Sequence, residues 1–204
     1  MGEYLFEAGQ FAFYRFYQKG FWFEKHPYSY SAAPNGGYIR ITIKSLGDFS
    51  NKVEQIKIGT KVIVDGPHGV FTANFGQSGK FLFAAGGVGI TPLRSLVEVL
   101  GKKKQDVVLL YGNRTENEII FKDELEELKV RYPSLKVVYV ISGDEKYPGE
   151  KGNIDREKIS RLVPDLKERD IYLCGPAAMT KKLLAEVLAI GVNKNQLHFE
   201  KFNL

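Results

Sequence analysis

The sequence Ala85-Gly86-Gly87-Val88-Gly89-Ile90-Thr91-Pro92 follows an apolar run, Phe81 to Ala84, that is typical of a buried β-strand. The glycines allow a tight turn and let a bulky anion approach the backbone. Thr91 is a favourable N-cap and Pro92 suits the first helical position, so we expect a helix to begin there. Because a helix start presents unpaired N–H groups and a partial positive charge, the segment predicts a phosphate or pyrophosphate cradle.

On its own, this turn does not decide between a nucleotide site and a structural turn. Its pattern from Gly87 to Pro92 is Gly-x-Gly-x-x-Pro, which differs from the dinucleotide fingerprint Gly-x-Gly-x-x-Gly. The next expected strand, 106–111, leads into Gly112-Asn113-Arg114 and offers no acidic residue to hold a ribose 2′-hydroxyl. An arginine at this place suits a 2′-phosphate better than a bare ribose.

The composition is that of an ordinary globular chain that can bury a core. Of the 204 residues, 44% are apolar and 26% charged, and no run approaches the roughly 20 apolar residues of a membrane span. The single cysteine, Cys174, excludes a disulfide framework and a cysteine-ligated iron–sulfur cluster. The three histidines lack metal-ligand spacing, so we expect no metal site. The net charge of +5 fits phosphate-bearing ligands or a negatively charged membrane face, but is too scattered to indicate nucleic acid.

The first part of the chain, residues 1–76, predicts a β-domain. The stretches 11–17, 38–44 and 61–64 alternate in polarity or are rich in β-branched and aromatic residues, and turns rich in glycine and proline separate them. No long helical period is visible there. This half therefore predicts an antiparallel β-barrel or a small sandwich.

The second part, residues 77–204, alternates strand-like and helix-like segments. This alternation predicts a Rossmann-like α/β domain with a parallel sheet covered by helices. Ligands of such sheets bind beyond the carboxyl ends of the strands, where the glycine turn at 86–89 and the turn Cys174-Gly175-Pro176 both lie. We expect strands at 81–85, 106–111, 135–141, 169–174 and 196–200, and helices at 92–101, 117–131, 155–162 and 176–190, with Ile120, Phe121, Leu125 and Leu128 on one face of the second helix.

Two segments of the first part place polar groups beside aromatic or apolar residues. His26 to Pro34 reads His-Pro-Tyr-Ser-Tyr-Ser-Ala-Ala-Pro, an aromatic strand with hydroxyls beside it. Arg40 to Ser50 is a basic strand that runs into a glycine turn, and such a turn can offer N–H groups to a phosphate. Taken alone, the first segment favours half-buried packing, and the second fits a hairpin turn as well.

In this order, however, the segments resemble the flavin- and pyridine-nucleotide-binding region of the ferredoxin–NADP reductase superfamily. The resemblance covers almost the whole chain, and within the superfamily it is nearest to the cytoplasmic dehydrogenase domain of bacterial NADPH oxidases and ferric reductases. Each motif is weak alone, but the ordered set is fairly specific. The motifs are His26 to Ser29, Ile39 to Ser50 and Val64 to Gly69 on the flavin side, and Gly86 to Pro92, Tyr111 to Arg114, Cys174 to Pro176 and Glu200 to Phe202 on the nucleotide side.

The resemblance implies that the first domain binds FAD. Tyr28 would then pack on the isoalloxazine, and Ser29 would hydrogen-bond near flavin N5, with Pro27 in the same motif. His26 stands where many relatives have an arginine, which implies a weaker and pH-sensitive contact with the pyrophosphate. The implied phosphate ligands are Arg40 as the principal cation, Lys44, and the Ser50 hydroxyl.

The resemblance also implies that the second domain binds NADPH, with NADH as the other possibility. An aromatic near the C-terminus, here Phe202, would cover the flavin face that the nicotinamide must reach; a core anchor is the alternative for this residue. Glu200 matches an acidic position near the site of hydride transfer, or else faces solvent on a last strand. The remaining implied contacts are Gly87, Val88, Gly89 and Thr91 at the pyrophosphate, Arg114 at the adenosine end, and Cys174, Gly175 and Pro176 beside the nicotinamide.

The function implied is that of a flavin-dependent dehydrogenase domain, which passes a hydride from NAD(P)H to FAD and then single electrons to an acceptor. The acceptor implied is the haem of a membrane domain on the same full-length chain, which would place this segment at the cytoplasmic face of the cell membrane. Two alternatives are a free-standing NAD(P)H:flavin reductase and a non-catalytic binding module on the same scaffold.

Two features fall outside these motifs. Relatives carry a longer stretch before the flavin motif than the 25 residues found here, so we expect an incomplete barrel or a fragment of a longer membrane protein, with an open sheet edge. The sequence Gly20-Phe21-Trp22-Phe23 places three aromatics beside a turn. It fits core packing about as well as a surface that docks a membrane haem domain.

Overall fold

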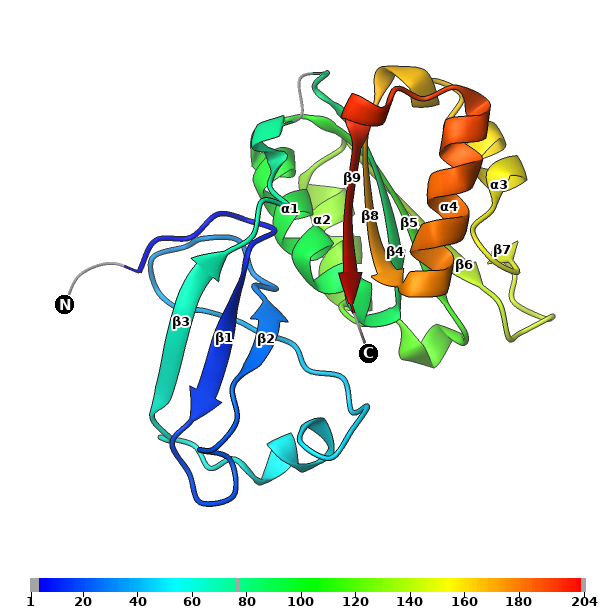
Figure 1. The fold of residues 1–204 in the computed structure, drawn as a ribbon. Coiled ribbons are helices and arrows are strands. Elements are labelled where there is room, and N and C mark those ends of the chain that lie inside the picture. The colour runs from blue at the N-terminus through cyan, green and yellow to red at the C-terminus, as the bar shows by residue number, and fades with distance from the viewer. Residues whose placement is uncertain (1–3, 76–77, 203–204) are drawn as a thin grey trace.

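The chain folds around two β-sheets that lie side by side (Figure 1). The computed structural model describes residues 4–75 and 78–202, and the side chains of Phe75, Lys201 and Phe202 lie outside that description. The smaller sheet comes from the first part of the chain and the larger one from the second. No helix in the described part of the chain is long and apolar enough to cross a bilayer.

The smaller sheet has three antiparallel strands in the order β2-β1-β3. These are β1 (Phe11–Phe16), β2 (His26–Ser29) and β3 (Val62–His68). Alternate residues of β1 point inward because side chains along a strand alternate between its two faces. The buried set on the inner face is Ala12, Tyr14 and Phe16, which pack with Phe21 and Tyr30.

The predicted strand at 38–44 does not form, and this expectation was wrong. Only one isolated bridge, between Tyr30 and Ile41, joins this segment to its neighbours. Side-chain contacts hold the segment instead: the Arg40 guanidinium reaches helix α2 (Lys122–Arg131), and the Thr42 hydroxyl lies 2.9 Å from the Ser31 hydroxyl. Within the residues that the structure describes, the small half is therefore a three-stranded antiparallel sheet, which forms part of the expected flavin-domain barrel.

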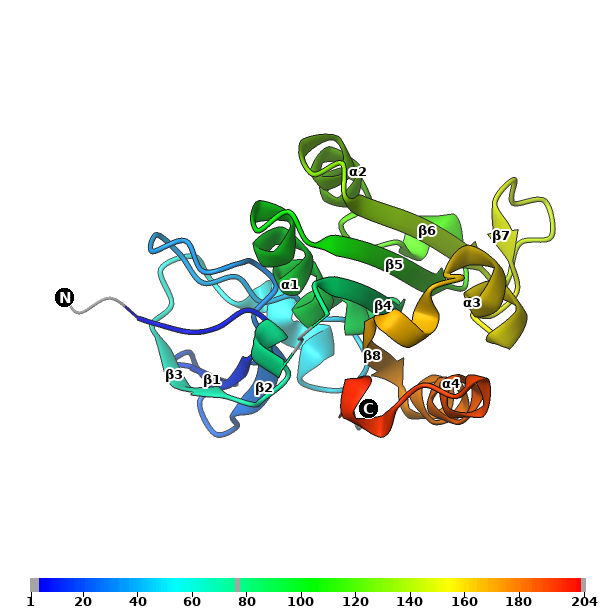
Figure 2. The ribbon, with the colours of Figure 1, turned by 90° about the horizontal axis from the view of Figure 1, so that it is seen from above.

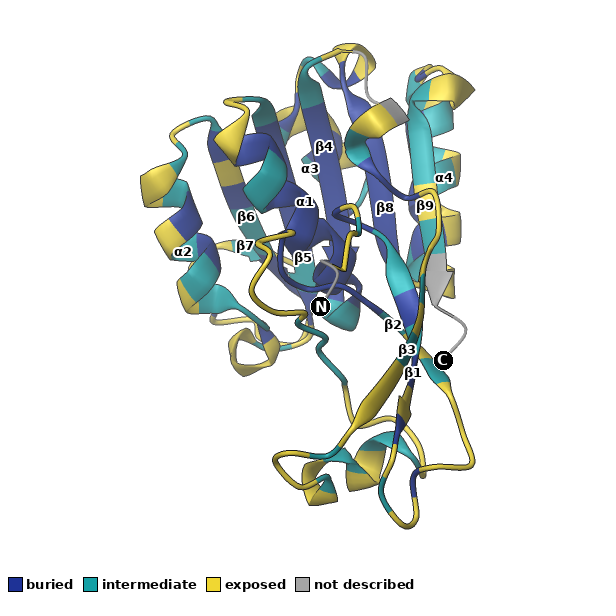
Figure 3. Cartoon of the chain, turned by 90° about the vertical axis from the view of Figure 1, so that its left-hand side faces the viewer, coloured by how far each residue is buried: buried dark blue, intermediate teal, exposed yellow. Residues whose placement is uncertain are grey.

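The larger sheet has six parallel strands and confirms the predicted α/β architecture. Helices α1 (Ile90–Lys102) and α2 cover one face, and helices α3 (Arg156–Leu162) and α4 (Ala177–Ile190) cover the other (Figures 1 and 2). Figure 3 shows that the buried residues concentrate in the middle strands. In spatial order the strands are β7 (Glu150–Lys151), β6 (Leu135–Ile141), β5 (Asp106–Asn113), β4 (Lys80–Gly86), β8 (Asp170–Pro176) and β9 (Leu197–Phe202).

Two helix starts differ from the sequence-based expectation. Helix α1 begins at Ile90, with Gly89 as its N-cap, so Thr91 is not the cap. The Thr91 hydroxyl donates instead to the carbonyl of Val88 at 3.0 Å. Helix α2 begins at Lys122 and not at 117, because Phe121 takes the left-handed conformation with φ 61° and breaks the helical path.

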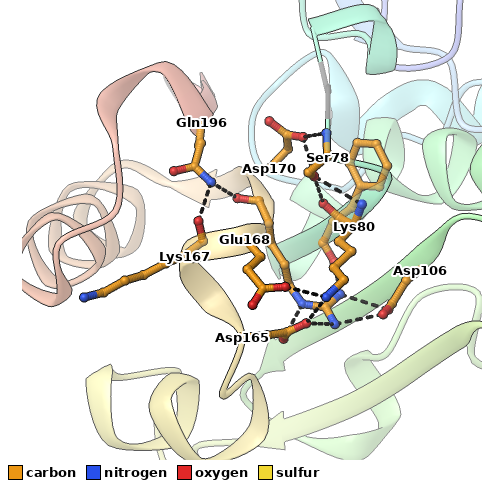
Figure 4. A network of polar contacts seen from close by, with 10 residues as sticks. Ser78, Lys80, Asp106, Asp165, Lys167, Glu168, Asp170 and Gln196 are labelled. Carbon is orange, nitrogen blue, oxygen red and sulfur yellow. Dashed lines mark hydrogen bonds and ion pairs between the residues drawn. The ribbon is translucent and has the colours of Figure 1, made fainter.

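A charged network closes the edge of the large sheet where β4, β5 and β8 begin (Figure 4). Arg169 is 5% exposed, and its guanidinium binds the carboxylates of Asp165 and Asp106. The same guanidinium donates to the backbone carbonyl of Phe81 at 3.2 Å. One buried cation thus joins the starts of two strands to the loop that precedes the third.

We predict that Arg169→Ala lowers the free energy of unfolding by about 2–3 kcal/mol, because it leaves two carboxylates and a carbonyl without their shared donor. Lys80→Ala is the matched control, since Lys80 pairs with Asp165 and Glu168 at the exposed rim of the same network. Its loss should cost less than about 1 kcal/mol. Urea unfolding of both variants measures the difference, and equal losses would contradict a special role for the buried cation.

Candidate functional site

A pocket of about 800 Å³ lies between the two sheets and takes residues from both. A volume of this size accommodates a ligand of cofactor dimensions. Strand β2 and the segment 42–50 form most of its wall, and the start of α1 and strand β9 complete it from the large half. The lining residues are Phe11, Phe13, Glu24, His26, Pro27, Tyr28, Ser29, Thr42, Lys44, Leu46, Gly47, Asp48, Phe49, Ser50, Val88, Thr91 and Glu200.

Aromatic rings form one wall of the pocket. The His26 and Phe49 rings lie 3.8 Å apart, and the Tyr28 ring stacks beyond His26 at 6.4 Å. Burial raises the pKa of Tyr28 to about 12, so its hydroxyl keeps its proton at neutral pH. An aromatic wall of this kind suits a flat, conjugated ligand.

Two oxygens that face the pocket have no hydrogen-bond partner among the described residues. They are Oγ of Ser29, a residue only 5% exposed, and Oε2 of Glu200. Leaving a buried polar atom unpaired costs free energy. A ligand with donor and acceptor atoms would remove that cost, so both oxygens are candidate ligand contacts.

The carboxyl of Glu200 and the thiol of Cys174 are direct neighbours in the register of β8 and β9. Burial raises the pKa of Glu200 to about 7. Burial, and then the nearby Glu200 carboxylate, raises the pKa of Cys174 well above its usual range. Glu200 therefore exchanges a proton near neutral pH, whereas Cys174 remains an uncharged thiol and not a thiolate nucleophile.

Two basic side chains, His26 and Lys44, appear among the lining residues. His26 Nε2 lies 2.9 Å from the carboxylate of Glu24, so its ring is engaged at the pocket rim. Lys44 Nζ lies 4.0 Å from the position that a Cβ atom on Gly87 would take. This lysine of the small half therefore reaches the glycine turn of the large half.

The structure places Arg40, expected as the principal phosphate ligand, away from the pocket lining. Its guanidinium binds both carboxylate oxygens of Glu124 at 2.8 and 3.0 Å and donates to the Ser31 carbonyl at 2.7 Å. The guanidinium also lies over the Phe121 ring. In this structure Arg40 ties the small half to α2.

The Ser50 hydroxyl, expected as a phosphate donor, shapes its own turn. Its Oγ accepts hydrogen bonds from the backbone N–H groups of Leu46 and Gly47 and lies 3.2 Å from the Gly47 carbonyl. These contacts hold the segment 46–50 along the pocket wall. Ser50 therefore positions that wall, and its own proton is directed into the turn.

The glycines of the predicted cradle divide into two kinds. Gly87 has φ 51° and borders open space next to Lys44. A side chain on Gly89 would collide with the carbonyl of Cys174, and one on Gly175 would meet the backbone of Gly86 at 3.0 Å. Only Gly87 is thus free to face a ligand, whereas Gly89 and Gly175 permit close packing of the turn against β8.

The structure does not bring all of the other predicted residues to the pocket. Val88 and Thr91 line the pocket, whereas Pro176, which ends β8, and the exposed Arg114, just after β5, are absent from its lining. Phe202 ends β9, and its side chain lies outside the described residues. Its expected contact with a flavin therefore stays a prediction.

Three aromatic residues of the pocket lining received no role from the sequence. Phe11 and Phe13 were visible only as alternating aromatics, and Phe49 lay inside the motif Ile39 to Ser50 without being singled out. Outside the pocket lining, Asn113 at the end of β5 is buried, and neither of its amide atoms has a hydrogen-bond partner among the described residues. The Gly112-Asn113-Arg114 sequence was the available signal, but the prediction used its arginine and gave the asparagine no role.

Comparison with known protein families gives two matches that follow the two sheets. A family described as "FAD-binding domain" matches residues 2–72, and one described as "Oxidoreductase NAD-binding domain" matches residues 83–184. The chain belongs to the ferredoxin–NADP reductase superfamily. Its two halves are an FAD-binding and an NAD(P)-binding domain, and the aromatic wall and unpaired oxygens of the pocket fit such ligands.

Curated relatives are about one-third identical to this chain. NADH-cytochrome b5 reductase 1 of Dictyostelium discoideum is 31% identical over 79% of this chain and 59% of its own length. The glycine betaine monooxygenase reductase subunit of Chromohalobacter salexigens is 32% identical over 86% of this chain and 50% of its own length. The chain thus spans between half and three-fifths of the length of these relatives.

Among solved structures, the flavohem-like FAD/NAD-binding domain of nitric oxide dioxygenase from Vibrio cholerae superposes with a TM-score of 0.88. The sequences are 25% identical, and the match covers 98% of this chain and 87% of the other. A ferredoxin reductase in carbazole 1,9a-dioxygenase gives a TM-score of 0.84 at 26% identity, over 97% of this chain and 61% of the other.

We predict that the stability of the nucleotide-free protein falls as the pH rises from about 4.5 to about 7. The raised pKa of Glu200 means that the folded state keeps a proton which the unfolded state has lost. Glu200→Gln should remove this effect, adding up to about 3 kcal/mol of stability at about pH 8 and almost nothing at about pH 4.

Urea unfolding at both pH values measures this gain. The exposed Glu157→Gln in α3 is the matched control and should show no such pH dependence. An equal gain for Glu200→Gln at both pH values would contradict a buried, titrating carboxyl.

We also predict that Lys44→Gln weakens FAD binding about tenfold, because Lys44 is a cation in the pocket lining with no ion pair among the described residues. Arg40→Gln should weaken FAD binding much less and should instead lower the stability of the protein, since its guanidinium is bound to Glu124. Calorimetric titration with FAD compares the two variants. A larger loss of affinity for Arg40→Gln would show that the guanidinium leaves Glu124 for the ligand.

Proposed function

We propose that this chain is the NAD(P)H- and FAD-binding dehydrogenase segment of an electron-transfer protein of the NADPH oxidase or ferric reductase type. The observation that carries the proposal is one pocket, shared by both domains, into which Ser29 and Glu200 present unpaired buried oxygens. The domain boundary we propose is residues 1–76 and 77–204. When both ligands are bound, NAD(P)H supplies a hydride and FAD takes it up and releases electrons singly.

The residues of the small domain position the flavin. Tyr28 and Phe49 offer aromatic surface from neighbouring parts of the pocket wall, and the Ser29 hydroxyl is free to donate to a ring nitrogen. Lys44, also in the pocket lining, offers positive charge for the phosphates, and His26 offers ring N–H groups. Because the aromatic wall is neutral and half-buried, it excludes water from the ring while the phosphates remain accessible to cations.

The residues of the large domain position the nicotinamide and hold a proton. The open edge of Gly87 allows close approach of a pyrophosphate, and Lys44, which reaches it from the small domain, supplies positive charge. Glu200 holds or releases a proton at its carboxylate near neutral pH. The neutral Cys174 thiol adds a small, uncharged surface next to Glu200.

The identity of the pyridine nucleotide and of the electron acceptor is part of the proposal. Arg114, exposed after β5, supports NADPH because a guanidinium binds a 2′-phosphate well. The acceptor we propose is the haem of a membrane domain on the same full-length protein, with this segment at the cytoplasmic membrane face. Relatives whose names include cytochrome b5 reductase and flavohemoglobin support transfer from such domains to haem.

A second candidate function is that of a free-standing reductase that uses FAD as a loosely held substrate. The observation that favours it is the ion pair of Arg40 with Glu124, which leaves Lys44 as the Lys/Arg side chain of the described lining. Gel filtration separates the two candidates: a dehydrogenase segment retains its flavin, whereas a flavin reductase loses it and shows a saturable dependence on added FAD.

We predict that anaerobic mixing of the FAD-loaded protein with NADPH bleaches the flavin absorbance, and that Ser29→Ala slows this step about tenfold through loss of one hydrogen bond. Ser45→Ala is the matched control, because Ser45 is exposed and absent from the pocket lining. Stopped-flow traces with NADPH and NADH give the rates and the nucleotide preference. No bleaching with either nucleotide would overturn the proposal in favour of a binding module.

A further inference from the structure

The loop between β1 and β2 lies at the end of the small sheet that points away from the parallel sheet (Figure 1). This end carries several exposed apolar side chains. In the loop between β1 and β2, Tyr17 is 60% exposed, Trp22 41% and Phe23 83%. The Trp22 ring touches both neighbours, with centroids 6.0 Å from Tyr17 and 5.4 Å from Phe23. The three rings therefore form one continuous surface.

A second loop, residues 55–61, adds to this surface. The Gln18 side chain donates to the Gln55 carbonyl at 2.9 Å and accepts from the Lys57 backbone N–H at 2.9 Å. The Tyr17 backbone N–H donates to the Lys61 carbonyl at 2.8 Å. These bonds fix the second loop against the first and place the fully exposed Ile58 on the same end. We call Tyr17, Trp22, Phe23 and Ile58 the aromatic tip.

Packing below the surface keeps the aromatic tip exposed. Phe21 is buried, and its ring meets that of Phe49 at 5.6 Å. Since Phe21 occupies the inward position of this short loop, the adjacent Trp22 and Phe23 are held outward. Exposing three large apolar side chains together is unfavourable in water and marks an interaction surface.

The charges around the aromatic tip are mostly positive. Lys19, Lys57 and Lys61 are exposed, and none of them forms an ion pair with another residue in the described ranges 4–75 and 78–202. Glu54, in the 3-10 helix Ser50–Gln55, is the exposed carboxylate next to them, and Glu24 at the other side pairs with His26. The tip therefore combines apolar surface with an excess of free positive charge.

We propose that the aromatic tip binds an anionic lipid surface. Tryptophan and tyrosine favour the boundary between water and lipid, and lysine side chains reach from there to the headgroups. Every cation in the two loops is a lysine, a residue depleted in protein–protein interfaces, where arginine is preferred. The loops also project from the end of the sheet, a shape that fits a flat surface. This inference does not depend on the redox function.

The chain offers its own probe, because Trp22 is its single tryptophan. The FAD-loaded 204-residue chain is mixed with phosphatidylcholine vesicles that contain or lack phosphatidylserine. We expect a blue shift of Trp22 emission, and co-sedimentation of the protein, with the anionic vesicles and much less with the neutral ones. Added salt should weaken the binding because it screens the lysines.

Variants separate the two components of the tip. Phe23→Ser should weaken binding about tenfold through loss of buried apolar area, and Lys57→Gln about fivefold through loss of one surface charge. The matched controls lie on the large half: Val130→Ser for an exposed apolar residue and Lys103→Gln for an exposed lysine. Both controls should bind as the unchanged protein does, and far-UV circular dichroism checks that every variant is folded.

Three results would overturn the proposal. The first is an unchanged Trp22 emission with both kinds of vesicle. The second is a loss of binding by Val130→Ser or Lys103→Gln that equals the loss by the tip variants, which would indicate adsorption without a specific site. The third is tip-dependent binding only to a membrane haem protein in neutral lipid, which would make the tip a protein-docking surface.

Discussion

Arg40 and Glu124 join the two halves of the chain, and the pocket depends on that junction because its walls come from both halves. The Arg40 guanidinium binds Glu124 through two hydrogen bonds, and Arg94 of α1 binds the same carboxylate at 2.8 Å. Burial alone would raise the pKa of Glu124. The hydrogen bonds and charges of the two arginines outweigh burial, lower this pKa and keep the carboxyl ionised.

The ion pairs of Glu124 with Arg40 and Arg94 stabilise the junction more than an exposed ion pair would. Exposed pairs contribute little, but here one carboxylate receives two planar guanidinium groups from different elements. A buried hydrogen bond from Ser95 to the Ala32 carbonyl, at 3.1 Å, fixes the same segment of the small half against α1. Together these contacts hold the 31–40 segment against α1 and α2, and the segment that continues from it, 42–50, forms the pocket wall.

The sequence was sufficient for the parallel sheet and its helices because their signals are local. The apolar run at 81–84 and the glycine turn after it determine β4 and the start of α1, and β6 has the predicted bounds 135–141. The Phe121 conformation could not be predicted in this way, since left-handed backbone is rare for a bulky residue and has no local sequence signal here.

The candidate site was predictable in part for the same reason. Ser29, Tyr28 and Lys44 lie in the pocket because strand β2 and its neighbouring segment carry them there as a unit. Arg40 was expected at the phosphates because a cation in a phosphate motif is a reasonable ligand. The sequence contains no sign that Glu124, 84 positions away, would bind it instead. Long-range ion pairs of this kind are invisible to local patterns.

The two edges of the large sheet differ in how well their polar groups are paired. Its amino edge is closed by Arg169, whose guanidinium satisfies two carboxylates and a backbone carbonyl. At its carboxyl edge, in contrast, Asn113 and Glu200 have buried polar atoms without a hydrogen-bond partner among the described residues. Unpaired groups of this kind are costly and persist where a ligand completes them. Because parallel strands all end at one edge, the fold brings these unpaired polar groups together beside the glycine turn. The hydrogen bonds and ion pairs at the other edge offset the free-energy cost of leaving them unpaired.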